Sequence, residues 1–130
     1  MSDNKHLVFV HGTLTDGSPD SHILYKSEYV GPGVTKDLYS MFLFGNNLTM
    51  VTDSIERTPI HGELYRVADC TMHILDTLYA HPNFYERRIV LVNIPGINTF
   101  DAYMYVSSSN NPFLKTAKEV LNGDIRSPQY

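Results

Sequence analysis

The segment His11-Gly12-Thr13-Leu14 is the first part of the chain whose residues could do chemistry. It follows the apolar run Leu7–Val10, so a buried strand is predicted to end at a glycine turn. Such a turn exposes successive backbone N–H groups, which can hold a carboxylate or an oxyanion. A partly protonated His11 would add attraction for an anion. The pattern also fits a plain turn in which Gly12 only permits the backbone geometry.

Four tyrosines in the second half of the chain could line an aromatic pocket. They are Tyr79, Tyr85, Tyr103 and Tyr105. Tyrosine rings can stack on a planar ligand, and they pack equally well inside a sheet or core. The sequence leaves both roles open.

The sequence motifs give little support for serine-hydrolase or metal chemistry. A His-Gly pair after a strand also occurs in the oxyanion loop of esterases, but this chain has no Gly-x-Ser-x-Gly motif and is far too short for that fold. Four further histidines show no metal-ligand spacing with a second histidine or with the single cysteine. They are His6, His22, His61 and His73. We therefore expect no metal site.

Strands and short helices must position these residues. The predicted strands are Leu7–Val10, Leu38–Phe44, Leu48–Thr52, Pro59–Val67, Arg87–Ile94 and Phe100–Val106. Three short helices are predicted. The first is capped at Ser18-Pro19 and ends by Gly31-Pro32-Gly33, the second runs from about Cys70 to Tyr79 with Asp69 as its cap, and the third opens at Asn111-Pro112. The third helix would carry an apolar face of Phe113, Leu114, Ala117, Val120 and Leu121, closed by Gly123.

These elements do not alternate regularly, which favours an α+β fold over a doubly wound sheet. We predict a small six-stranded mixed β-barrel with short flanking helices. A barrel of this size is filled by its own side chains, so a ligand site is expected at its mouth or in a cleft beside it.

Composition limits the classes of partner. The 130 residues fit one domain, predicted over 1–123 with a tail at 124–130. A net charge of −4 gives no positive field for nucleic acid. No apolar run approaches the roughly 20 residues that cross a bilayer, and no secretory signal is evident. We expect a cytoplasmic protein that binds a small molecule; whether it forms a homo-oligomer stays open.

Five short motifs, in order over residues 7–107, resemble the gamma-glutamylcyclotransferase-like family, of the gamma-glutamylamine cyclotransferase type. They are His11-Gly12-Thr13-Leu14, Gly62-Glu63-Leu64-Tyr65, Leu75-Asp76-Thr77-Leu78-Tyr79, Pro82 with Tyr85-Glu86-Arg87, and Ala102-Tyr103-Met104-Tyr105-Val106. The resemblance implies a six-stranded barrel whose cavity has the glycine loop as its floor. It also implies a reaction without cofactor, in which the substrate's α-amino group attacks its own side-chain amide and releases 5-oxoproline and an amine.

The chain departs from the family pattern where the resemblance places the proton-transferring glutamate. That position holds Tyr79. A phenol with a pKa of about 10 stays protonated at neutral pH and accepts a proton poorly. Losing a positioned acid-base group typically lowers the rate by ~10²–10⁴. His11, where the family has tyrosine, is a second departure.

Another residue could replace the lost base. His81, His11 and Glu63 are the candidates, although His81 could equally be a solvent-exposed loop residue and Glu63 a fold-supporting carboxylate paired with Arg87.

The main hypothesis is a family protein that binds a small anionic or amine-bearing metabolite without efficient catalysis, using the glycine loop, Tyr85 and Tyr105. The first alternative is an active cyclotransferase that uses a substitute base. The second is a regulatory protein that sequesters a nucleotide-like signal.

Overall fold

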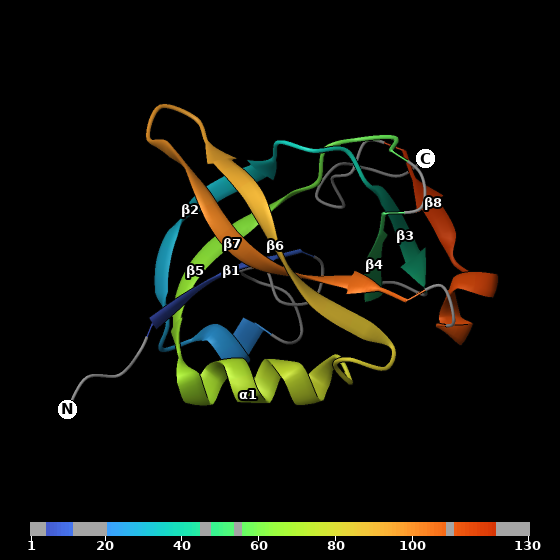
Figure 1. Ribbon diagram of the computed structural model, residues 1–130, viewed down its shortest axis with the longest axis horizontal. Helices are drawn as coiled ribbons and strands as arrows, with labels where there is room; N and C mark the ends of the chain where they lie inside the picture. The colour runs from blue at the N-terminus through green and yellow to red at the C-terminus, as the bar shows by residue number, and fades with distance from the viewer. Residues whose placement is uncertain (1–4, 12–20, 45–47, 54–55, 109–110, 122–130) are drawn as a thin grey trace.

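The computed structural model describes residues 5–11, 21–44, 48–53, 56–108 and 111–121. It contains a curved barrel, a smaller sheet beside it, and the helix α1 at one end of the barrel (Figure 1). The elements in chain order are β1 (Lys5–Val10), η2 (Ser21–Leu24), β2 (Glu28–Thr35), β3 (Ser40–Phe44), β4 (Leu48–Thr52), β5 (His61–Ala68), α1 (Asp69–Leu78), β6 (Tyr85–Ile94), β7 (Asn98–Ser107), η3 (Pro112–Lys115) and β8 (Lys118–Val120).

The barrel closes in the order β1-β5-β2-β6-β7. Its pairs are antiparallel except for β1 and β7, which run parallel with Val8 opposite Tyr103. The α+β class is therefore confirmed, but the barrel has five strands where the sequence predicted six. Strands β3 and β4, predicted as part of one barrel, instead form a separate sheet with β8 in the order β4-β3-β8.

Strand β2 was not predicted, because Gly31-Pro32-Gly33 was interpreted as the end of a helix. These residues lie inside β2, and the preceding helical segment is only the four-residue turn η2. Glycine is needed at position 33 because a Cβ atom there would lie 2.7 Å from a methyl carbon of Val92 on β6. The close approach of β2 to β6 thus explains Gly33, which the sequence analysis took for a turn residue. The predicted cap at Ser18-Pro19 lies outside the described residues.

The predicted C-terminal helix is also wrong. The segment forms the short turn η3 and then β8, whose Val120 lies opposite Met41 of β3. Val120 is buried at the end of β8, whereas Leu121, just after the strand, is exposed, so the two residues do not share an apolar face. Gly123 and the tail 124–130 lie outside the described residues.

The helix α1 forms close to where it was predicted. It begins at Asp69 rather than after it, with Ala68 as a cap residue that makes no side-chain bond. Met72 and Leu75 are buried against the barrel, as their spacing predicted. No helix in the described part of the chain is long and apolar enough to cross a membrane.

Candidate functional site

Three of the predicted site tyrosines pack against one another directly after α1. The ring of Tyr79 stacks on Tyr105, with centroids 4.3 Å apart and planes inclined by 14°. It meets Tyr85 edge-on at 5.0 Å. All three are buried and belong to one apolar cluster with Tyr65. Tyr79, Tyr85 and Tyr105 therefore do come together. They pack in the core, which is one of the two roles that the sequence left open.

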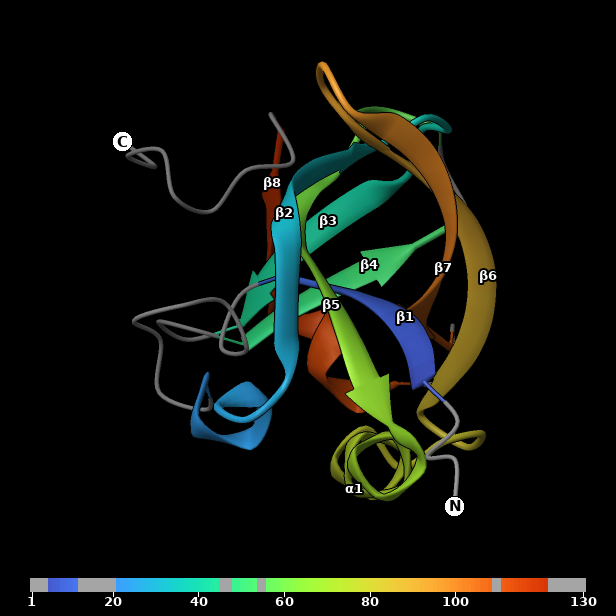
Figure 2. The same ribbon diagram turned by 90° about the vertical axis from the view of Figure 1, so that its left-hand side faces the viewer.

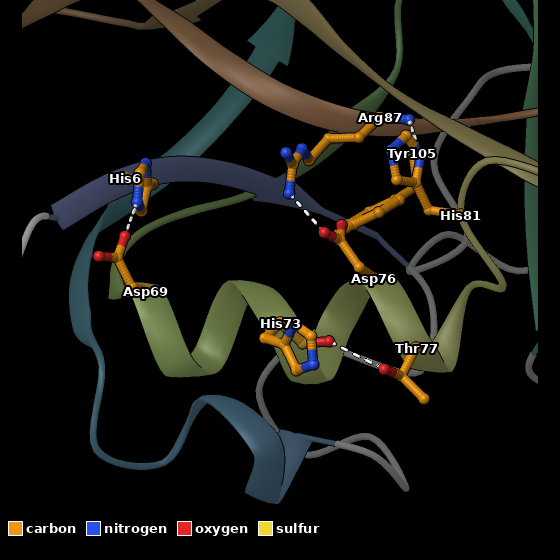
Figure 3. A network of polar contacts seen from close by, with 8 residues as sticks. All are labelled: His6, Asp69, His73, Asp76, Thr77, His81, Arg87 and Tyr105. Atoms are coloured by element: carbon orange, nitrogen blue, oxygen red, sulfur yellow. Dashed lines mark hydrogen bonds and ion pairs between the residues drawn. The ribbon is translucent and has the colours of Figure 1, made fainter.

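A carboxylate fixes this stack from the side of α1. The Tyr105 hydroxyl donates a hydrogen bond of 2.6 Å to Asp76 Oδ1, and Arg87 Nη1 donates one of 2.7 Å to Asp76 Oδ2 (Figure 3). Burial, followed by the adjacent Asp76 carboxylate, raises the pKa of Tyr105 far above its ordinary value. The Tyr105 phenol is therefore protonated at neutral pH. The arginine expected to pair with Glu63 pairs with Asp76 instead.

Tyr103, the fourth member of the predicted tyrosine group, has a different neighbour. The Arg87 guanidinium lies over its ring, 4.9 Å from the centroid. This is cation–π geometry. Asp76, Arg87 and Tyr103 thus combine a carboxylate, a cation and an aromatic ring in one cluster.

The histidine that follows the stack, His81, is engaged by the backbone. Its Nδ1 accepts a 3.0 Å hydrogen bond from the backbone N–H of Arg87 (Figure 3). In the neutral imidazole the proton then sits on Nε2, which leaves no unoccupied acceptor nitrogen on the ring. His81 is partly buried and not fully in solvent.

His11 is buried at the end of β1, and its Nδ1 forms a hydrogen bond with the Thr49 hydroxyl. Burial lowers the pKa of His11 to about 4. The imidazole is therefore neutral at pH 7, which contradicts the partial positive charge expected beside the glycine turn. Gly12, Thr13 and Leu14 lie outside the described residues.

Tyr85 carries a buried hydroxyl that meets no hydrogen-bond partner at bonding geometry in the described part of the chain. Burial raises the pKa of Tyr85, and the neighbouring Asn111 side chain partly offsets the rise. Like Tyr105, this phenol is protonated at neutral pH.

A pocket of about 510 Å³ opens beside the tyrosine cluster, between η2, β2 and β5. Figure 2 shows η2 close to the start of β2, with α1 seen end-on below the barrel. The buried residue Leu24 forms part of the wall. The other lining residues are His22, Tyr25, Ser27, Tyr29, Glu63 and Tyr65. Among the described residues of the predicted site, Glu63 lines this pocket, while Tyr79 lies in the packed cluster and does not line it.

Sequence reasoning missed the five pocket-lining residues at positions 22–29. The segment was interpreted as a helix that carries Ile23 and Leu24 inward, so the tyrosines on it had no assigned role. The pairing of β2 with β5 sets Tyr29 opposite Tyr65 and so brings Tyr29 close to Glu63. No local spacing signal could have found a pairing between segments more than thirty residues apart in the chain.

A second hollow of about 280 Å³ lies on the side of the barrel formed by β1, β6 and β7. His6, Tyr103 and Asp101 are among the residues that line it. In the described ranges, no three histidine, cysteine, aspartate or glutamate side chains gather as a metal-binding group.

Comparison with known proteins agrees with this architecture. A family model described as gamma-glutamyl cyclotransferase, AIG2-like, matches residues 8–126. A Methanocaldococcus jannaschii protein with a provisional gamma-glutamylcyclotransferase name is 31% identical over 99 residues, covering 75% of this chain and 81% of that protein. The gamma-glutamylaminecyclotransferase of Bos taurus is 25% identical over 113 residues, covering 81% and 67%.

Solved structures show the same fold. The crystal structure of a mouse AIG2-like protein superimposes with a TM-score of 0.78 at 20% identity, covering 96% of this chain and 92% of that one. A uropathogenic E. coli-specific protein superimposes with a TM-score of 0.75 at 16% identity, covering 95% and 94%.

Proposed function

The chain belongs to the gamma-glutamyl cyclotransferase, AIG2-like family, and we propose that it binds a small anionic or amine-bearing metabolite without efficient cyclotransferase turnover. The pocket beside Glu63 is the proposed ligand site. One observation carries the proposal: Tyr79, which stands where the family resemblance places the general base, is buried in a flat stack on Tyr105.

Cyclotransferase chemistry needs a group that moves a proton twice. The attacking α-ammonium must lose a proton before its nitrogen can form the ring, and the leaving amine must gain one as the amide bond breaks. A phenol with an ordinary pKa of about 10 holds its proton at neutral pH and so cannot perform the first transfer efficiently. The stack on Tyr105 also fixes the Tyr79 ring in place.

Replacement of Tyr79 by glutamate tests this proposal. Tyr65 belongs to the same cluster as Tyr79 and also lines the pocket, so we expect the space that opens when Tyr79 is shortened to join the ligand site. Tyr79→Glu should then release 5-oxoproline from a panel of γ-glutamyl amines at least about 100 times faster than the natural chain, the lower bound for a positioned acid-base group. Tyr79→Gln is the matched control, because it opens the same space without a base. If the natural chain turns over these substrates as fast as Tyr79→Glu, the proposed loss of catalysis is wrong.

The location of Glu63 favours a second candidate function, an active cyclotransferase with a substitute base. Of the three candidate bases, Glu63 lines the pocket, whereas His81 uses Nδ1 for the Arg87 backbone and His11 has a pKa lowered to about 4. Under this alternative, the natural chain releases 5-oxoproline and Glu63→Gln abolishes the release. Turnover that survives Glu63→Gln would exclude Glu63 as the base.

A further inference from the structure

We infer that the pocket beside Glu63 is a subsite for an alkylammonium group, in which one carboxylate and a set of tyrosine rings recognise the cation. This assignment rests on the proposed small-molecule function and selects between the two ligand chemistries that the function leaves open. Three features of the pocket carry it: its charge, its aromatic walls and its depth.

The charge of the lining favours a cation. Among the described residues that line the pocket, Glu63 is the carboxylate, and no lysine or arginine is present. An anionic ligand would meet this carboxylate, and the described lining offers no lysine or arginine to offset the repulsion, whereas an ammonium group would be attracted. The His11 imidazole, which the sequence suggested as an anion-attracting group, is buried, is not among the residues that line the pocket, and is neutral at pH 7.

Tyrosine rings provide the walls. Tyr25, Tyr29 and Tyr65 all line the pocket. The rings of Tyr29 and Tyr65 lie 5.3 Å apart and are tilted by 57°, so they do not cover each other face to face. A cation held over a tyrosine face is attracted by the negative face of the ring. The same fold already places the Arg87 cation over Tyr103 and beside Asp76, which combines the same groups in a structural role.

The pairing of strands holds the carboxylate next to these rings. Glu63 and Tyr65 are two residues apart on β5 and therefore point to the same side of the strand. The Tyr65 hydroxyl donates a 3.0 Å hydrogen bond to Glu63 Oε1. This bond orients the carboxylate before any ligand arrives.

Exposure increases from the base of the pocket to its rim. Tyr65 is 7% exposed, Tyr29 is 51% exposed and Tyr25 is 84% exposed. An amine ligand would therefore insert its charged nitrogen toward Glu63 and leave the rest of the molecule near solvent. The subsite thus selects for the cationic end and tolerates variation in the remainder of the ligand.

The test is a two-dimensional ¹H–¹⁵N NMR titration of the full chain at constant ionic strength. The probes are n-butylammonium chloride, tetramethylammonium chloride and, as the anionic counterpart, sodium butyrate. We expect either ammonium salt to shift the amides of residues 22–29 and 63–65 in a saturable manner. Butyrate should leave these amides unchanged.

Two variants separate the contributions of charge and rings. Glu63→Gln should weaken ammonium binding by at least about tenfold, as expected for the loss of an interaction with a charged group. Tyr29→Leu should weaken it by about two- to fivefold, as expected for one partly exposed ring. Glu56→Gln is the matched control: it removes the same charge from an exposed residue outside the pocket lining and should leave binding unchanged.

The outcomes discriminate between this assignment and the proposed function. Equal shifts with butyrate, no saturable shift with either ammonium salt, or full binding by both Glu63→Gln and Tyr29→Leu would overturn the ammonium subsite. A 5-oxoproline activity gained by Tyr79→Glu would still support the proposed function in that case. The dispersion of each variant's NMR spectrum shows whether it is folded, and Tyr29→Leu provides the test if Glu63→Gln is not.

Discussion

The imidazole of His11 lies in the core, where it meets the Thr49 hydroxyl and burial lowers its pKa to about 4. In unfolded chains its pKa is near the ordinary 6.5. As the pH falls below 6.5, His11 therefore binds a proton in the unfolded state, whereas in the folded state it stays neutral down to about pH 4. The neutral His11 therefore stabilises the fold above pH 6.5, and this contribution is lost as the pH falls. We expect the free energy of unfolding to drop by about 2 kcal/mol between pH 7 and pH 5.

Urea denaturation at several pH values measures this loss. His11→Gln removes the titrating group, so its free energy of unfolding should fall less steeply between pH 7 and pH 5 than that of the natural chain. His73→Gln, which alters an exposed histidine of α1, should keep the natural slope. Identical slopes for the natural chain and His11→Gln would show that His11 is not buried as a neutral group.

At the scale of elements, β5 approaches β1 closely at Gly62. A Cβ atom at this position would overlap the carbonyl oxygen of Val10 and lie 2.9 Å from Phe9 Cζ. The Val10 carbonyl is backbone and cannot move aside as a flexible side chain could. We expect Gly62→Ala to lower the free energy of unfolding by about 3 kcal/mol or more, at the upper end of overpacking costs.

Gly96→Ala is the comparison for this prediction. Gly96 lies in the turn between β6 and β7 with φ of +79°, and a Cβ there would have no neighbour within 4 Å. Only backbone strain is added, so the cost should be about 1 kcal/mol. Urea denaturation of both variants checks the ranking; a smaller cost at Gly62 than at Gly96 would contradict the close packing of β1 on β5.

The elements also show which features a sequence can and cannot specify. β1, β5, α1, β6 and β7 were predicted near their observed positions, because their own apolar spacing determines them. β2 was missed because its glycines serve contacts with other strands, which no local pattern reveals. β8 was missed because its burial depends on Met41, some eighty residues earlier in the chain.

The candidate site likewise has features that local sequence can indicate and features that depend on tertiary structure. Glu63 and the tyrosine group were proposed as site residues because they occur in motifs that resemble the family, and Glu63 does line a pocket. Which tyrosines line a pocket could not be predicted, since Tyr79 and Tyr105 pack on each other while Tyr25 and Tyr29 reach the pocket. The difference is set by strand pairing and by the Asp76 bond to Tyr105, both tertiary features.

At the scale of the whole molecule, the barrel and the three-stranded sheet share one core. Met41 of β3 and Val51 of β4 belong to the same buried cluster as Phe9, Leu64 and Val92 of the barrel. Val120 of β8 joins them. A sheet that contributes side chains to the barrel's own core should unfold with the barrel rather than before it.

Met41→Ala tests this cooperativity. Met41 is fully buried, so its truncation should cost about 2–5 kcal/mol through lost contacts and the cavity left behind. If the core is shared, hydrogen exchange measured by mass spectrometry should accelerate in β5, the barrel strand paired with β1 and β2, as much as in β3 and β4. Leu38→Ala, at a half-exposed position, should leave β5 unchanged. Acceleration confined to β3, β4 and β8 would instead mean that the small sheet opens alone, and that the barrel can keep its pocket while its neighbour is unfolded.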